Sequence, residues 1–413
     1  MLQKNAPLAS LLDDIQRAGL RYFWEGAHPV SGWAYDRRVI GRQPGGDLVS
    51  IGGTGFSALA LTVGVARGWI TRAKAAERLL LMVRHLERVP RFHGAFPHFV
   101  HGASGQAIAF SRFDDGGDLV ETALLLQGLL CARTFFDGRS AVETELRERI
   151  TGLYDAVEWD WYAGERGDAL YWHWSQRYGW RMDLRIRGWN EGLIAYVLAS
   201  GSTTHPIPAN LFETGWCGKG SMVNGHSYYG HVLPLGEPYG GPLFLSHYSF
   251  CTLDPRPLRD RYASYWEQVL AHARINHAHC LENPNGYAGY STDCWGLTAS
   301  HGPRRYLASS PLNDHGIIAP TAALSSFPYL PEEAEAALRH FLSFRDGRLR
   351  GPYGLVDAFA ADGHWIARTN LAVNQGPIVA MIENHRSGLL WDLVRGVPEI
   401  SCGLDRLGLM AAS

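Results

Sequence analysis

Apolar residues recur at helical spacing along most of the chain. In the first such segment, Leu11, Leu12, Ile15, Ala18 and Tyr22 fall on one face of a helix with 3.6 residues per turn. The same periodicity, or a run of small apolar residues, predicts further helices over residues 55–65, 71–88, 121–135, 142–156, 191–199, 259–277, 316–324, 331–344, 375–386 and 389–394. Signals for strands are few and short.

Long segments rich in glycine, proline and aromatic residues separate these helices, at residues 171–188, 216–248 and 283–311. Loops of this length are either functional or disordered, and these are too aromatic for disorder. No charge run or low-complexity linker divides the chain. We therefore expect one all-α domain over residues 1–413, an (α/α)6 toroid of helix pairs with long aromatic loops on one face. The number of helices fits such a toroid, whereas closure of the ring does not follow from periodicity.

The composition excludes several classes of partner. The net charge of −2 provides no basic field for nucleic acid or for an anionic membrane. No run of eighteen apolar residues predicts a membrane-spanning helix. The first 20 residues carry Asp13 and Asp14 and lack the apolar centre of a secretory leader, which favours the cytoplasm. A leader preceding this sequence would instead imply the periplasm.

The side chains that could bind a cofactor or metal lack the required spacing. The six cysteines are scattered without a C-x-x-C, which favours buried thiols but is compatible with disulfides. No H-E-x-x-H occurs, no G-K-[ST] follows the glycines at residues 52–55, and no nucleophile elbow is present. We therefore expect no metal and no cofactor. The 14 Trp, 18 Tyr and 18 His instead suit a sugar ligand, whose C–H faces stack on rings while its hydroxyls form hydrogen bonds.

An acidic stretch precedes one of the most apolar helical runs. Asp114, Asp115, Asp118 and Glu121 lie within eight residues. On one continuous helix, Asp114, Asp118 and Glu121 would share a face, and their mutual repulsion would raise a pKa, as a catalytic acid requires. Gly116-Gly117 should interrupt such a helix, and Asp118 with Glu121 also fits a capping box. The two interpretations are compatible with each other.

Two further acids lie in segments that contain glycine and aromatic residues. Glu191, in Trp189-Asn190-Glu191-Gly192, is either a general acid whose pKa a neighbouring indole raises or a first-turn glutamate that complements the helix dipole. Asp357 follows Gly351-Pro352-Tyr353-Gly354 and is either a site carboxylate or a turn residue.

Several of these segments, taken in order, resemble the bacterial glucoamylase-like domain family. They are Phe23-Trp24-Glu25, residues 50–56, Arg67-Gly68-Trp69-Ile70, the acidic stretch, Trp189-Asn190-Glu191-Gly192, residues 283–287, residues 293–299 and Gly351-Pro352-Tyr353-Gly354. The resemblance extends over nearly the whole chain. Asp115, the Gly116-Gly117 pair and the Trp-Asn before Glu191 depart from the family pattern.

The characterised branch of that family consists of inverting endo-β-1,2-glucanases with an (α/α)6 toroid, and some relatives release sophorose. The resemblance implies a hydrolase for β-1,2-glucan or sophoro-oligosaccharides, with Glu191 as the general acid. Asp114, Asp118 and Glu121 match the acidic cluster of the family. The general base would be Asp118, Glu121 or Asp357.

The candidate sugar contacts are aromatic or polar residues near these acids. Phe113, Trp189, Tyr290 and Trp295 are candidates for stacking, and each is equally plausible as a core residue; Asn190 and His226 are candidates for hydrogen bonds. Two alternatives stay open: another sugar-active enzyme on the same toroid, such as an epimerase or a polysaccharide lyase, or a non-catalytic glycan-binding protein. The oligomeric state is not indicated.

Overall fold

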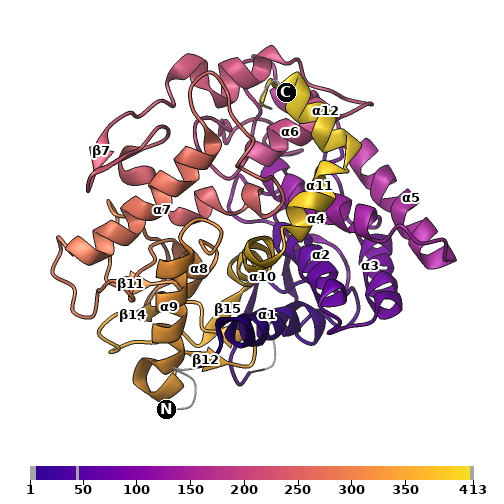
Figure 1. Ribbon diagram of the computed structural model, residues 1–413. Coiled ribbons are helices and arrows are strands. Elements are labelled where there is room, and N and C mark those ends of the chain that lie inside the picture. The colour runs from indigo at the N-terminus through magenta and orange to yellow at the C-terminus, as the bar shows by residue number, and fades with distance from the viewer. Residues whose placement is uncertain (1–5, 43–45, 410–413) are drawn as a thin grey trace.

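The computed structural model describes residues 6–42 and 46–409 and is rich in helices (Figure 1). The helices, in chain order, are α1 (Leu8–Trp24), α2 (Ile51–Ala66), α3 (Arg72–Leu86), α4 (Leu119–Phe135), α5 (Ala141–Asp155), α6 (Leu193–Gly201), α7 (Tyr265–Glu282), α8 (Pro320–Leu324), α9 (Pro331–Ser343), α10 (Ala372–Arg386), α11 (Leu389–Arg395) and α12 (Pro398–Arg406). Each predicted helix is present, and most ends agree within a few residues.

The differences from the prediction have local causes. Helix α7 begins at Tyr265 rather than at residue 259, because the Ser264 hydroxyl caps it by accepting the Glu267 N–H. Helix α8 begins only at Pro320, since the residues before it form a strand. Helix α6 begins at Leu193, which leaves Glu191 in the turn before it. Helix α12 was not predicted.

The structure also contains short strands, which the expected all-α class did not include. The strands are β1 (Arg37–Val39), β2 (Leu48–Ser50), β3 (Phe99–His101), β4 (Ala107–Ile108), β5 (Gly117–Asp118), β6 (His173–Trp174), β7 (Ser227–Tyr228), β8 (His231–Val232), β9 (Ala299–His301), β10 (Tyr306–Ala308), β11 (Ile317–Ile318), β12 (Arg350–Gly351), β13 (Gly354–Leu355), β14 (Phe359–Ala360) and β15 (Thr369–Leu371). They pair antiparallel, with β2, β3 and β4 in one sheet and β5–β6, β9–β10 and β1–β15 among the two-stranded ones.

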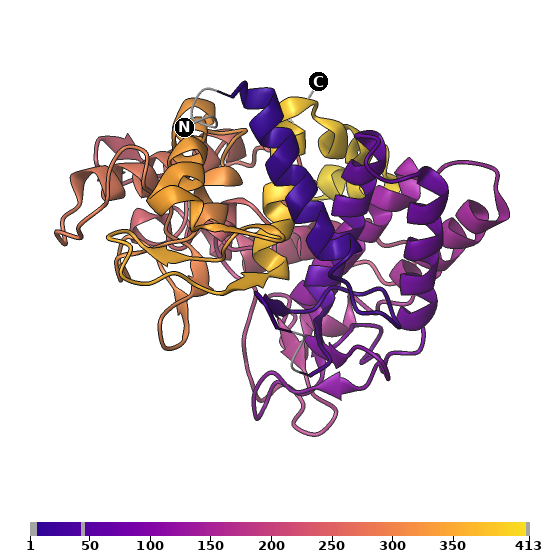
Figure 2. The same ribbon diagram turned by 90° about the horizontal axis from the view of Figure 1, so that it is seen from below.

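The helices differ in how much of their surface is buried. Nearly every residue of α2, α4 and α10 is buried, whereas α3, α5 and α9 bury one face only. Helix α2 packs on α4 and α10, α4 also packs on α6, and α3 packs on α5 (Figure 1). Figure 2 shows the short strands and long connecting segments mostly toward its lower side, and both chain ends at its upper edge. One hydrophobic cluster extends from Leu11 to Leu409.

Two glycines allow α2 and α4 to cross at backbone contact. A Cβ atom on Gly55 would lie 2.1 Å from the Leu124 carbonyl oxygen, and one on Gly128 would lie 2.0 Å from the Gly55 carbonyl oxygen. Both obstacles are backbone atoms inside buried helices, so neither can move aside independently. The small apolar run in residues 55–65 therefore serves the close approach of this helix to α4.

We predict that Gly128→Ala lowers the free energy of unfolding by about 2 kcal/mol or more, because the added methyl group overpacks the crossing. Gly152→Ala is the matched control, since Gly152 is an exposed glycine in α5 with no atom within 4 Å of its added Cβ. The control should gain up to about 1 kcal/mol through helix propensity. Urea unfolding of both variants tests this, and equal stability of the two would contradict the crossing argument.

Candidate active site

Asp118 is the N-cap of α4, as the capping-box spacing predicted. Its Oδ1 accepts the Glu121 N–H at 2.9 Å. The reciprocal half of a capping box is absent, because the Asp118 N–H donates to the Phe96 carbonyl instead. Asp118 belongs to β5 and is paired with His173 in β6. Of the two interpretations of the acidic stretch, the structure therefore has the helix interrupted at Gly116-Gly117 and not one continuous helix through Asp114, Asp118 and Glu121.

Gly117 explains why a strand replaces the helix at this point. A Cβ atom there would lie 2.2 Å from the Tyr162 hydroxyl oxygen, and one on Gly116 would lie 2.1 Å from the Trp174 carbonyl oxygen. The glycine pair thus lets β5 lie against β6, and Asp114 precedes this strand in a loop. The three acids meet through the strand pairing and the helix start rather than through helical periodicity.

The Glu121 carboxylate turns toward the N-terminus of α2. Its Oε2 accepts the Gly52 N–H at 2.6 Å and the Ser50 hydroxyl at 3.4 Å. A Cβ atom on Gly52 would lie 2.8 Å from the same oxygen, so glycine is required for this approach. The partial positive charge at a helix N-terminus further stabilises the carboxylate there. Helix α2 therefore holds an acid that belongs to α4.

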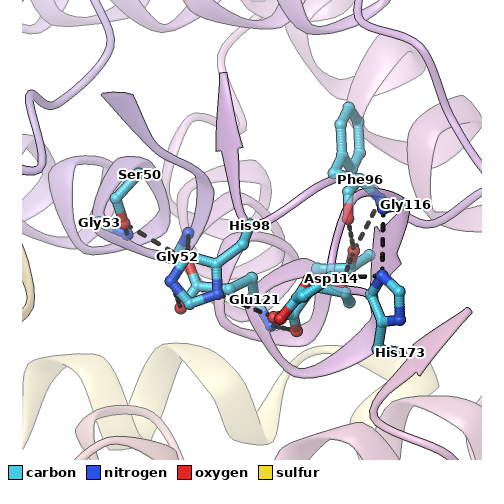
Figure 3. A network of polar contacts seen from close by, with 11 residues as sticks. Ser50, Gly52, Gly53, Phe96, His98, Asp114, Gly116, Glu121 and His173 are labelled. Carbon is cyan, nitrogen blue, oxygen red and sulfur yellow. Dashed lines mark hydrogen bonds and ion pairs between the residues drawn. The ribbon is translucent and has the colours of Figure 1, made fainter. Parts of the chain in front are cut away.

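His98 lies between two of these acids (Figure 3). Its Nδ1 is 2.9 Å from Asp118 Oδ2, and its Nε2 is 3.9 Å from Glu121 Oε1. Burial lowers the pKa of His98, but the charge of Glu121 and the hydrogen bond and charge of Asp118 outweigh it and raise the pKa to about 9. The imidazolium is thus the cation that balances the carboxylates at neutral pH.

Asp114 lies at the other edge of this group, beside His173 (Figure 3). Its Oδ1 is 3.3 Å from His173 Nε2, which also accepts the Gly116 N–H at 3.0 Å. Burial, and after it the charge of Asp118, raises the pKa of Asp114 to about 7. Burial lowers the pKa of His173, so this histidine offers no cation to compensate. Asp114, Asp118 and Glu121 together are called the acid cluster below.

Glu191 lies near the acid cluster, in the turn before α6. Burial raises its pKa to about 7, and the charges of Asp118 and Glu121 add to the rise. Its carbonyl oxygen accepts the Ser249 hydroxyl at 2.7 Å. Asn190 fixes the turn, because its side chain accepts the Gly192 N–H and donates to the Arg187 carbonyl. The structure thus gathers Glu191 with the acids that follow residue 113.

Asp357 is buried in a different part of the fold, and both of its carboxylate oxygens have close hydrogen-bond donors. Oδ2 accepts the His301 N–H at 2.6 Å, and Oδ1 accepts the Asn374 side-chain amide at 2.7 Å. Burial raises the pKa of Asp357 to about 6. Burial raises the pKa of Glu121 as well, and the charge of Asp36 adds to the rise at both Glu121 and Asp357.

Two predicted stacking residues are core residues in the structure. Trp295 is 0% exposed, and its indole N–H donates to the Glu333 carbonyl. Trp189 is buried, with its ring parallel to Phe250 at 5.6 Å and edge-on to Tyr265 at 5.3 Å. Neither ring has a free face for a sugar. Both expectations are corrected, and the Trp189 ring anchors the turn that carries Glu191.

The other predicted contacts are distributed around the molecule. Tyr290 donates its hydroxyl to Asp314 at 2.6 Å. His226 is exposed, one residue before the β7–β8 hairpin at the rim of Figure 1. Phe113 is half-buried, edge-on to Tyr178, with the Arg181 guanidinium 4.5 Å from its ring centre. Of these three, Phe113 alone is adjacent in sequence to the acid cluster.

Three residues that contact the acids were not predicted: Gly52, His98 and His173. Gly52 was part of a segment quoted for the family resemblance, but nothing in the sequence indicated that its N–H binds Glu121. His98 and His173 lie 20 and 55 residues from Asp118, and only the folded chain shows the pairing. A lone histidine carries no signal of its own.

The described residues were compared with the arrangements that a metal site and a membrane span require. Within residues 6–42 and 46–409, no three or more His, Cys, Asp or Glu side chains are arranged to hold a metal ion. No helix in those ranges is both long and apolar enough to cross a bilayer. The N-terminal stretch that was considered as a possible secretory leader forms α1 from Leu8 onward. Residues 1–5 lie outside the described residues. All six cysteines are free, and Cys402 is exposed.

Comparison with known proteins identifies the family. A family model described as "Putative glucoamylase" matches residues 183–398. The curated exo β-1,2-glucooligosaccharide sophorohydrolase (non-reducing end) of Parabacteroides distasonis is 40% identical over 418 residues, which cover 96% of this chain. This chain spans 57% of the length of that relative. The chain therefore belongs to the glucoamylase-like family.

Solved structures agree with this membership. The endo-β-1,2-glucanase from Chitinophaga pinensis, in complex with sophorotriose and glucose, is 45% identical with a TM-score of 0.94, covering 97% of this chain and 98% of that one. The endo-β-1,2-glucanase from Talaromyces funiculosus, in complex with sophorose, is 12% identical with a TM-score of 0.68, covering 95% and 90%. The fungal likeness shows the fold alone.

We predict that His98→Gln changes the pH dependence of stability. The pKa of His98 is raised in the folded state to about 9. The stability it contributes is fully present below pH ~6.5 and is lost as the pH rises through ~9. Between these values, the wild type should lose roughly 2–3 kcal/mol relative to the variant.

Urea unfolding at half-unit steps from pH 6 to 9.5 measures this difference. His364→Gln is the control, because His364 is exposed and interacts with Asp362 at the surface. Its curve should run parallel to that of the wild type. A parallel curve for His98→Gln as well would contradict the bridging role of the imidazolium.

Proposed function

We propose that this protein is a glycoside hydrolase that cleaves β-1,2-linked glucan or sophoro-oligosaccharides with inversion of the anomeric centre. The observation that carries the proposal is the pair of contrasting environments at the site. Burial, with the charges of Asp118 and Glu121 added to it, raises the pKa of Glu191 to about 7, whereas the carboxylates of Asp118 and Glu121 receive backbone N–H donors and the His98 imidazolium. Carboxyl groups whose environments differ in this way can divide the acid and base roles. The names of the relatives supply the linkage.

Glu191 is assigned as the general acid. A carboxyl with a pKa near 7 is half protonated at neutral pH and can give its proton to the glycosidic oxygen as the C–O bond breaks. The burial that raises its pKa also favours the protonated form until a sugar is in place. Transfer of the proton leaves Glu191 ionised, and a proton from solvent restores it after the products leave.

The general base is assigned first to Glu121 among Asp118, Glu121 and Asp357. A base must accept a proton from a water molecule, so it needs an oxygen that is not already saturated. The side chains of Asp118 and Asp357 are 1% and 0% exposed, with close donors at both oxygens. Glu121 keeps Oε1, with the His98 ring nitrogen 3.9 Å away. Water that loses its proton to Glu121 adds to the anomeric carbon opposite the leaving group.

The proposal includes an (α/α)6 toroid and a single domain over residues 1–413. The neighbour relations support an inner set: α10 packs on α2, α2 on α4, α4 on α6, and α8 on α10. The outer helices α1, α3, α5 and α9 pack on or beside these. The hydrophobic cluster that runs from Leu11 to Leu409 supports one domain. In this arrangement the starts of α2, α4 and α6 bring Gly52, Asp118 and Glu191 to one end of the helices.

We predict that Glu191→Gln lowers kcat on linear β-1,2-glucan by about 10²–10⁴-fold, because the amide cannot donate the proton. In the wild type, activity should fall as the pH rises above about 7, where Glu191 loses its proton. Asp114 has a similar pKa, so Asp114→Asn distinguishes the two groups. The alkaline loss should persist in Asp114→Asn if Glu191 is responsible.

Release of sophoro-oligosaccharides is the readout, and proton NMR of the first products reports the anomer. Glu332→Gln, at an exposed first-turn position of α9, is the matched control and should be unchanged. Full activity of Glu191→Gln would contradict the assignment of Glu191 as the general acid. An unsaturated product would indicate a lyase, an unchanged chain length an epimerase, and binding without turnover a glycan-binding protein.

We predict that azide restores activity to the base variant and yields an inverted glycosyl azide, since azide needs no proton acceptor. Glu121→Ala, Asp118→Ala and Asp357→Ala are compared at equal folded concentration, checked by circular dichroism. Rescue of Glu121→Ala alone is the expected result. Rescue confined to Asp118→Ala or to Asp357→Ala would transfer the role to that residue.

A further inference from the structure

Exposed aromatic rings are rare in this molecule despite its composition. In the described part of the chain, the most exposed aromatic side chains are Phe110 at 56%, Tyr306 at 47% and Trp161 at 41%. All other Phe, Tyr and Trp residues there are buried or half-buried. Phe110 contacts His98, and Tyr306 is paired with His301; both of these partners bind carboxylates of the site. None of these three was among the predicted sugar contacts.

Phe110 lies one imidazole ring away from the acid cluster. Its ring centre is 4.5 Å from that of His98, the residue that contacts both Asp118 and Glu121. The ring is also near-parallel to Phe99, at 5.7 Å and 29°, and Phe99 in turn contacts His98 at 4.4 Å. The Phe110 N–H donates to the Asp114 carbonyl at 2.8 Å, which anchors the segment to the loop of an acid. These contacts fix the position of the exposed Phe110 ring.

Tyr306 lies in β10, the strand that pairs with β9, whose backbone binds Asp357. It is directly opposite His301 in the β9–β10 pair, and the His301 N–H binds Asp357 Oδ2. Directly opposed side chains of an antiparallel pair lie on the same face of the sheet. Burial of the hydroxyl, followed by the charges of Asp357, Asp36 and Glu191, raises the pKa of Tyr306. The Tyr306 ring is therefore open to solvent on the sheet face that it shares with His301.

We propose that Phe110 and Tyr306 are two sugar-contacting platforms at different edges of the carboxylates, and that they bind separate residues of one neutral gluco-oligosaccharide. This inference rests on the proposed function. Phe110 offers an apolar face for the C–H surface of a sugar ring, and Tyr306 offers a face together with a hydroxyl that can hydrogen-bond. In this proposal both side chains act on binding and register and not on proton transfer.

The test separates binding from turnover by using Glu191→Gln as the parent. Sophorotriose is titrated by calorimetry into this parent and into the parent carrying Phe110→Ala, Tyr306→Ala or Tyr306→Phe. Loss of one stacking contact should weaken binding about ten-fold for each alanine variant. Tyr306→Phe keeps the ring and should weaken binding less than Tyr306→Ala. Leu81→Ala, which truncates an exposed apolar residue of α3, is the control and should bind like the parent.

The outcomes distinguish the two proposals. Weakening confined to the aromatic variants supports the platforms. Unchanged binding by both Phe110→Ala and Tyr306→Ala, with a parent that binds sophorotriose, overturns the platforms and leaves the proposed function standing. Absence of binding by the parent, together with an inactive wild type on β-1,2-glucan, overturns the proposed function and the platforms with it.

Discussion

The hydrogen bond from the Gly52 N–H to the Glu121 carboxylate is the interaction on which the site depends. It joins the start of α2 to the start of α4 and exists only because the two helices cross at backbone contact through Gly55 and Gly128. With any larger residue at the crossing, α2 would stand away from α4 and its N-terminus would no longer reach the acid. An acid inside a protein needs a compensating donor, and here the donor belongs to a neighbouring helix. The packing of the core thereby determines the chemistry at its edge.

A second constraint follows from the charge that this arrangement concentrates. Asp114, Asp118 and Glu121 lie close together with largely buried side chains, and His98 is the cation between two of them. One imidazolium cannot neutralise three carboxylates, so part of the charge has to be removed by protonation. Burial, with the neighbouring charges added to it, raises the pKa values of Asp114 and Glu191 to about 7 and raises that of Glu121 as well. In the proposed mechanism, the proton that Glu191 gives to the leaving group therefore results from its burial near the charges of Asp118 and Glu121.

The helices could be predicted from the sequence because periodic burial and capping are local properties. The spacing of Asp118 and Glu121 identified Asp118 as a possible cap, and Asp118 caps α4 in the structure. The arrangement of the acids could not be predicted in this way. The glycine pair predicted a break before Asp118, but not the strand that forms there. Close approach of β6 and Tyr162 to Gly116 and Gly117 favours that strand, and those neighbours lie more than 40 residues further along the chain. Pairings such as His98 with Asp118 likewise arise only when distant segments meet.

The aromatic residues show the difference between composition and position. Their abundance indicated sugar binding, but most of the rings pack on one another inside the irregular loops. Trp189 lies against Phe250 and Tyr265, and Trp161, Trp174 and Trp180 form another such group. A long segment with little regular secondary structure lacks a repeating hydrogen-bond ladder, so ring packing has to fix its conformation. The same rings that hold Glu191 in its turn are for that reason unable to stack on a substrate. In the proposed function, contact with a sugar is therefore left to the few rings that the loop cores do not cover.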